Sequence, residues 1–160
     1  MLSEKLSELG YPSGPAQLVV LDRFHVAVRT GNLVFTSGQV SSMGNIQING
    51  KVGGDIALAT AQKAAEICTV NCLRAVAAVA DMESIERVVK VFGMVNVAAG
   101  FNDTASVING CSDFLETVLG DKGGHHARSA VGMVLPGDWA VEIEMVVALA
   151  DSSGRIATRT

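Results

Sequence analysis

Apolar and polar residues alternate along the stretch from Val131 to Val147. The apolar positions are Val131, Met133 and Leu135 before Pro136-Gly137-Asp138, and Val141, Ile143, Met145 and Val147 after it. A two-residue period is typical of a strand with one buried face, and Pro-Gly-Asp is typical of a turn. The pattern therefore predicts a β-hairpin, and it places Arg128, Glu142 and Glu144 on the face opposite the apolar side chains.

Two segments have the spacing of helices. The longer runs from 55 to about 79, contains neither Gly nor Pro, and begins at Asp55 as its predicted N-cap. The second runs from about 103 to 119 and ends at Gly120, a residue type common at the C-terminal end of a helix. Leu2, Leu6 and Leu9 indicate a third, short helix near the start of the chain.

Strands are predicted at 16–21, 25–29, 33–36 and 88–97, and the segment 43–54 is polar and rich in turns. The last of these strands is rich in β-branched residues and apolar enough to be central in a sheet. Two helices are too few to cover both faces of such a sheet, so they are predicted to share one face of an α+β domain. We expect the other face to meet the sheets of other subunits in a homo-oligomer.

Length and composition place few restrictions on function. The 160 residues are 49% hydrophobic and 18% charged, which fits one domain spanning 1–160 with part of its surface covered by other subunits. The polar segment 151–160 has no periodicity and is predicted to be mobile. The net charge of −4 argues against a protein that binds nucleic acid through phosphate contacts.

No stretch of the sequence has the pattern of a signal peptide or a membrane span, so a cytoplasmic protein without membrane contact is expected. Cys68, Cys72 and Cys111 are odd in number and lie in helical segments, which argues against a disulfide framework. Cys68 and Cys72 have the spacing to share a metal ion, but burial as small apolar residues is the favoured interpretation. Gly50-Lys51 lacks the spacing of a phosphate loop.

Arg128 and Glu142 are the first candidates for function, because a charged side chain inside an apolar hairpin costs free energy unless it is paired or used. The alternative is an ion pair between them that braces the hairpin or a subunit contact. His126 lies two residues before Arg128 and is predicted to line the rim of a cleft. Its neighbour His125 points the opposite way in an extended segment, so the pair is poorly placed to bind a metal.

Four short motifs, in this order, resemble the YjgF/RidA/L-PSP family. They are Gly31-Asn32-Leu33-Val34-Phe35-Thr36-Ser37-Gly38-Gln39, Val107-Ile108-Asn109, Ala127-Arg128-Ser129 and Val141-Glu142-Ile143-Glu144. The chain is similar to a longer branch of the family, which carries the endoribonuclease L-PSP name, and it has additional residues at 1–15 and around 98–104. The resemblance covers roughly residues 31–149.

The resemblance implies a chorismate-mutase-like α+β fold, with two helices packed on one face of the sheet. It implies a homotrimer with three clefts between subunits, each binding a small-molecule carboxylic acid. In the best-known branch these clefts hydrolyse reactive 2-imino and enamino acids to 2-oxo acids and ammonia. No metal or organic cofactor is required for that reaction.

The resemblance also assigns roles to residues. Arg128 would hold the substrate carboxylate through a two-pronged contact, and Glu142 would orient the attacking water and accept its proton. The implied substrate contacts are Ser37, Gly38, Asn109 and the backbone around Ala130, to which the sequence adds His126. Taken alone, Asn109 could equally be a solvated polar residue, and Gly38 a packing position.

This chain departs from the best-known branch at three positions. Ala130 replaces a Cys, His126 replaces a Pro, and Ala16 stands where that branch has a Tyr, so an aromatic wall would have to come from Tyr11 or Phe24. Two other functions therefore remain as alternatives. One is a trimer that binds small metabolites without turnover. The other is an L-PSP-type endoribonuclease, which the acidic charge and the scarcity of aromatic residues disfavour.

Overall fold

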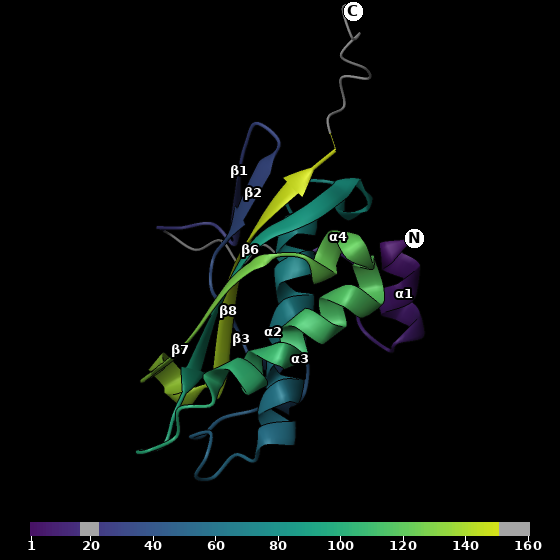
Figure 1. Cartoon of the computed structure of the whole chain (residues 1–160). Coiled ribbons are helices and arrows are strands. Elements are labelled where there is room, and N and C mark those ends of the chain that lie inside the picture. Colours follow the sequence, from purple (N-terminus) through teal and green to yellow (C-terminus); the bar gives the residue numbers. More distant parts are fainter. Residues whose placement is uncertain (17–22, 151–160) are drawn as a thin grey trace, which may run out of the picture.

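The computed structural model describes residues 1–16 and 23–150, and it shows one mixed sheet with its long helices on one side (Figure 1). The strand predicted at 16–21 therefore lies outside the described residues, apart from Ala16. The tail predicted at 151–160 lies entirely outside them. The α+β architecture predicted from the sequence is confirmed.

In the described part of the chain, six strands form the main sheet in the order β1-β2-β8-β6-β7, and β3 also pairs with β8. Their bounds are β1 (Ala27–Thr30), β2 (Leu33–Thr36), β3 (Gln39–Val40), β6 (Ile85–Asn96), β7 (Ala127–Met133) and β8 (Val141–Leu149). A separate small ladder of β4 (Ser42–Met43) and β5 (Ile46–Gln47) lies at the start of the segment 43–54, which was predicted to be rich in turns.

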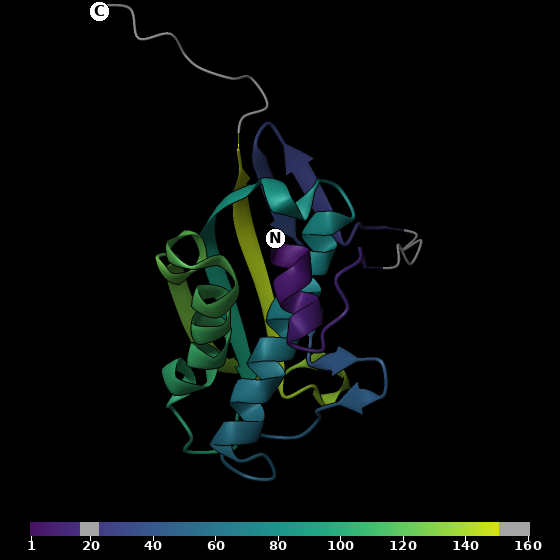
Figure 2. The ribbon, with the colours of Figure 1, turned by 90° about the vertical axis from the view of Figure 1, so that its right-hand side faces the viewer.

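Two long helices, α2 (Leu58–Ala77) and α3 (Thr104–Leu119), pack against each other and against the sheet. Short elements complete the fold: α1 (Leu2–Glu8), η1 (Met82–Ser84), α4 (Asp121–Gly124) and η2 (Pro136–Asp138). The first of these, α1, contacts α3 and η1 and lies outside the long helices (Figure 2). The predicted end of α3 is confirmed, since Gly120 caps it with a φ of 61°.

The predicted start of α2 is wrong. Asp55 is not its N-cap, because the helix begins at Leu58 and is preceded by Ala57, which makes no side-chain cap. Asp55 instead lies in a compact turn in which the Gly54 and Ile56 amides both donate to the Lys51 carbonyl, at 3.1 Å each. These backbone hydrogen bonds satisfy the turn locally, and the N-cap of the helix lies two positions further along the chain, at Ala57.

The predicted hairpin is also wrong. The strands β7 and β8 do not pair with each other, because β6 lies between them, parallel to β7 and antiparallel to β8. The connection from β7 to β8 passes over the end of β6, where the buried Asn96 Nδ2 donates to Asp138 Oδ1 at 2.8 Å. A β-strand followed by a helix and a second strand normally returns in parallel, and β6-α3-β7 is such a unit.

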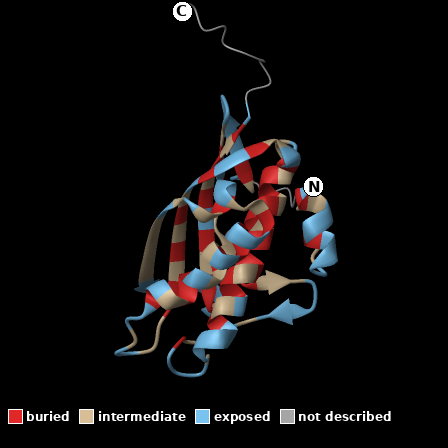
Figure 3. Ribbon diagram, turned by 45° about the vertical axis from the view of Figure 1, so that its right-hand side comes forward, coloured by how far each residue is buried: buried red, intermediate tan, exposed pale blue. Residues whose placement is uncertain are grey.

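The hydrophobic core lies between the sheet and the two long helices (Figure 3). Glycines let these layers approach closely. A Cβ on Gly93 of β6 would lie 2.5 Å from Ile108 of α3, and a Cβ on Gly110 of α3 would overlap the Gln62 backbone of α2. Because a bulkier residue at either position would push α3 away, these glycines fix how near α3 lies to β6 and to α2.

No helix covers the opposite face of the sheet within the described residues, and this open face is largely apolar. Val28 is 53% exposed and Phe35 is 43% exposed, and the two are partners across β1 and β2. Phe92, Met94 and Val146 are half-buried on the same face. The expectation that two helices leave one sheet face uncovered within a single chain is confirmed.

Candidate functional site: an arginine cluster and a carboxylate on opposite faces of the sheet

Arg128 lies on β7 and points toward α3. Its partner across the parallel ladder is Val91, which is fully buried on the helix side of the sheet. Arg128 Nη1 donates to Asn109 Oδ1 at 2.9 Å and to Ser112 Oγ at 3.0 Å, and both acceptors lie on α3. The structure therefore brings together Arg128 and Asn109, two of the residues predicted from the sequence.

His126 joins this cluster through Ser112, a residue that the sequence analysis did not single out. His126 Nε2 lies 3.1 Å from Ser112 Oγ, and His126 Nδ1 lies 2.5 Å from the Gly123 carbonyl oxygen. Ser112 could have been found from its position three residues after Asn109, because residues three apart share one side of a helix.

Arg128 as a residue is half-buried, and its guanidinium forms no ion pair with a carboxylate of residues 1–16 or 23–150. The acceptors that hold it, an amide oxygen and a hydroxyl, are both neutral. A partly desolvated cation without a counter-charge favours the binding of an anion. The cluster is therefore suited to a carboxylate.

Glu142 lies elsewhere, on the open face beside the bend between β2 and β3. Its partners across the ladders are Val40 and Met94. Gly38 at the bend makes room for it, because a Cβ there would overlap Glu142 Oε1. Ser37 is close by and donates its hydroxyl to the His25 carbonyl at 2.5 Å. Ser37, Gly38 and Glu142 thus form a second group of predicted site residues.

The environment of Glu142 favours its neutral form. Partial burial raises the pKa of its carboxyl, and the negative charge of Glu144 raises that pKa further. A raised pKa suits a carboxylate that takes up a proton and passes it on near neutral pH.

The two groups lie on opposite faces of the sheet. Arg128 pairs with Val91 and Glu142 with Met94, three positions apart on β6, and side chains of a strand alternate between faces. One strand also separates β7 from β8, so the two backbones are about 10 Å apart. The prediction that Arg128 and Glu142 share a face is wrong, and so is the alternative of an ion pair between them within one chain.

The apolar character of the open face explains why the alternation pattern assigned Arg128 to the wrong face. Val131 and Met133 project to that face and remain half-exposed, whereas the helix side of β7 carries small residues beside Arg128. A Cβ on Gly132 would lie 2.9 Å from Val97 Cγ2 on that side. Because α3 lies so close, only small side chains fit there, and the apolar positions of β7 mark the face away from the helices.

Ala130 presents its carbonyl oxygen to α3, where it accepts a hydrogen bond from Thr104 Oγ1 at 3.1 Å. Its side chain packs against the core, so replacement of the family's Cys leaves a small apolar contact. The position therefore keeps a backbone acceptor near the cluster and has no thiol.

The three cysteines are free thiols buried among core residues. Burial raises the pKa of the Cys111 thiol to about 12, although Thr69 and the charge of Arg128 act in the opposite direction. The described residues contain no group of three or more His, Cys, Asp or Glu that could hold a metal ion. They also contain no helix that is both long and apolar enough to cross a membrane.

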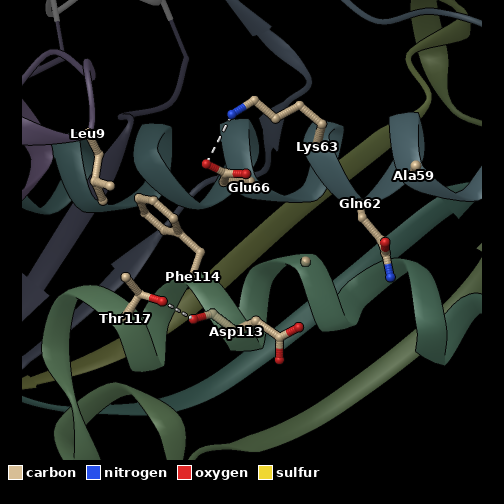
Figure 4. Close-up of a pocket in the computed structure, with 9 residues that line it drawn as sticks. Leu9, Ala59, Gln62, Lys63, Glu66, Asp113, Phe114 and Thr117 are labelled. Carbon is tan, nitrogen blue, oxygen red and sulfur yellow. Dashed lines mark hydrogen bonds and ion pairs between the residues drawn. The ribbon is translucent and has the colours of Figure 1, made fainter.

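A groove of about 470 Å³ lies on the outer side of α2 and α3, away from both groups of site residues (Figure 4). Lys63 and Glu66 form an ion pair on its wall at 3.1 Å, and Phe114 lies across from them on α3. Tyr11 donates to Glu66 and packs edge-on against Phe114, at 5.5 Å between ring centres. Tyr11 therefore contacts residues of this outer groove and none of the Arg128 cluster.

The fold and the Arg128 cluster can now be compared with known proteins. Atu1372 from Agrobacterium tumefaciens is 40% identical and superimposes with a TM-score of 0.82 over 94% of each chain. TdcF from E. coli, crystallised with bound serine, is 24% identical, and the match covers 86% of this chain and 94% of TdcF with a TM-score of 0.58. Protein TCP17 of Trypanosoma cruzi is 32% identical over 84% of this chain and 86% of its own.

The sequence profile described as Endoribonuclease L-PSP matches residues 15–149. Because the match covers most of the chain, the protein belongs to this family, and the resemblance drawn from the four motifs is confirmed. Residues 1–14, which include α1, precede the matched region.

Proposed function

We propose that the protein is a hydrolytic deaminase that converts reactive 2-imino or enamino acids to 2-oxo acids and ammonia. The observation that carries this proposal is the half-buried residue Arg128, whose guanidinium Asn109 and Ser112 hold without neutralising it. An intermediate of this kind carries a carboxylate, and a guanidinium binds a carboxylate through two parallel hydrogen bonds.

We propose further that two subunits of a homotrimer complete each site. Within one chain, Arg128 faces the helices and Glu142 faces the open side of the sheet, so the two cannot contact one small ligand. A neighbouring subunit that covers the apolar open face would bring its own Glu142 group toward the Arg128 cluster. Burial of Val28, Phe35 and their neighbours would stabilise such an assembly.

In this proposal, Arg128 fixes the carboxylate and so holds the adjacent imine carbon in position for attack. Glu142 of the other subunit accepts a proton from water as the water oxygen bonds to that carbon. The electron pair of the C=N bond passes to nitrogen, which takes up a proton. The hydroxyl proton then passes to the same nitrogen as the C–N bond breaks, which releases ammonia and leaves the 2-oxo acid.

The serine bound to TdcF supports this proposal, because serine is a small amino acid whose carboxylate adjoins the α-carbon, the position of the imine carbon in a 2-imino acid. Endoribonuclease activity, which the family description names, is less compatible with the net charge of −4.

The decisive experiment generates a 2-imino acid in place with an amino-acid oxidase and follows its decay by trapping with semicarbazide. We expect the protein to speed the decay and Arg128→Ala to abolish the effect. Acceleration that survives in Arg128→Ala would contradict the proposed site. Binding of a 2-oxo acid without acceleration would instead indicate a metabolite-binding trimer, and cleavage of added RNA would favour the ribonuclease alternative.

A further inference from the structure

We propose that Ser112 and His126 are a positioning pair that selects which edge of the Arg128 guanidinium is offered to a carboxylate. This inference rests on the proposed function and names two residues that would determine its preference for carboxylate ligands. It starts from a continuous chain of contacts that runs from the Gly123 carbonyl through His126 and Ser112 to Arg128.

The direction of each hydrogen bond in this series of contacts follows from the Gly123 carbonyl, where the series begins. The Gly123 carbonyl can only accept, so His126 Nδ1, 2.5 Å away, carries the hydrogen. In the neutral ring Nε2 is then an acceptor, and the Ser112 hydroxyl, 3.1 Å away, donates to it. The hydrogen of Ser112 therefore points away from Arg128, and its lone pairs remain for the guanidinium.

Arg128 Nη1 carries two hydrogens, and two acceptors meet them: Asn109 Oδ1 at 2.9 Å and Ser112 Oγ at 3.0 Å. The remaining pair of parallel donors is Nε–H and one hydrogen of Nη2. These groups have no hydrogen-bond partner among the described residues, and they have the spacing that matches the two oxygens of a carboxylate.

His126 thus contributes to binding without touching the ligand. A hydroxyl without the histidine could turn its hydrogen toward the guanidinium, which would repel Nη1 and release the side chain. With the histidine in place, the geometry of Arg128 is set before the ligand arrives, so less conformational freedom is lost on binding.

Binding of a small 2-oxo acid, measured by isothermal titration calorimetry on the full chain, tests the pair separately from turnover. We expect Ser112→Ala and His126→Phe each to weaken binding about tenfold, the usual effect of losing a hydrogen bond to a charged group. Ser112→Thr retains the hydroxyl and should bind within about threefold of the wild type. His125→Phe, at the exposed neighbouring position, is the matched control and should bind normally.

The same samples provide a second measurement, which would not change if Ser112 and His126 had a purely structural role. Nitrogen NMR of the His126 ring should show a protonated Nδ1 and a bare Nε2 in the wild type, and thermal unfolding should show that the variants are folded. Wild-type affinity in both Ser112→Ala and His126→Phe, with binding lost in Arg128→Ala, would overturn the positioning pair and leave the proposed function intact. Unchanged binding in Arg128→Ala, or no binding by the wild type, would overturn both.

Discussion

Arg128 and Glu142 lie on opposite faces of one sheet, with β6 between the strands that carry them. Their partners on β6, Val91 and Met94, are three positions apart, so no rotamer change brings the two side chains to one ligand. A reaction that uses both groups must therefore combine Arg128 from one subunit with Glu142 from another.

Complementation between two inactive variants tests this arrangement. Arg128→Ala and Glu142→Gln should each be inactive alone. If the subunits are dissociated, mixed in equal amounts and reassembled, about a quarter of the clefts should receive an intact Arg128 and an intact Glu142 from two different chains. Imine hydrolysis should then recover to about a quarter of the wild-type rate. Activity that stays at the level of the separate variants would show that each site uses one chain.

Glu142→Gln should raise the thermal midpoint at neutral pH while it abolishes activity. Burial and Glu144 raise the pKa of the Glu142 carboxyl, so the folded protein holds its proton more tightly than the unfolded chain. The stability from this group is full below the unfolded pKa and is lost as the pH rises through the folded pKa. Calorimetry at pH 4 and pH 7 checks the sign of this effect. The rise in thermal midpoint caused by Glu142→Gln should appear at pH 7 and shrink at pH 4.

Glu144→Gln should shift the pH dependence of the reaction to lower pH. The Glu144 charge contributes to the raised pKa of Glu142, so its removal allows Glu142 to ionise at lower pH. The acidic limb of kcat/KM against pH, which reports a required carboxylate, should move with it. An acidic limb at the same pH in both proteins would assign that limb to another group.

Gly38→Ala should impair activity far more than stability. A Cβ at this position would overlap Glu142 Oε1, and the half-buried carboxylate can give way only by leaving its position beside the bend. We expect kcat to fall at least tenfold, because a displaced base no longer reaches the attacking water. Ala at Gly14, where a Cβ meets nothing within 4 Å, provides the control and should have full activity.

Gly110→Ala should destabilise the fold by about 2 kcal/mol, a typical effect of overpacking. Its Cβ would overlap the Gln62 backbone, which cannot move without shifting α2 relative to α3. Urea unfolding monitored by circular dichroism measures the change, and Gly14→Ala again serves for comparison. Equal unfolding midpoints for the two variants would show that the helices adapt without cost.

The local patterns in the sequence were sufficient to predict the helices and most strands, because these depend on periodicity and on end residues such as Gly120. These local patterns do not indicate which strands pair with each other in the sheet. Both β7 and β8 alternate as a hairpin would, and only the α3 crossover shows that β7 must return beside β6. Seven residues separate β7 from β8, which is longer than a tight hairpin turn and is enough to cross a strand.

The prediction of the candidate site was incomplete for a related reason. Motif resemblance identified Arg128, Asn109 and Glu142, but alternation assigned Arg128 to the wrong face. That inference assumed that apolar residues face the core, and it fails where an uncovered sheet face is itself apolar, as at Val131. Ser112 has no motif of its own; its spacing from Asn109 places it on the same side of α3, and the packing of α3 on β7 shows its contact with Arg128.

The β6-α3-β7 crossover also bears on how the protein folds. Arg128 and its Asn109 partner are 19 residues apart and belong to one continuous unit, whereas a bond such as that from the Val141 amide to Ser41 Oγ closes a loop of 100 residues. Short loops close at a lower entropic cost. The Arg128 cluster should therefore acquire protection from hydrogen exchange early in refolding, and the region around Ser41 and Glu142 should follow once the two ends of the chain meet.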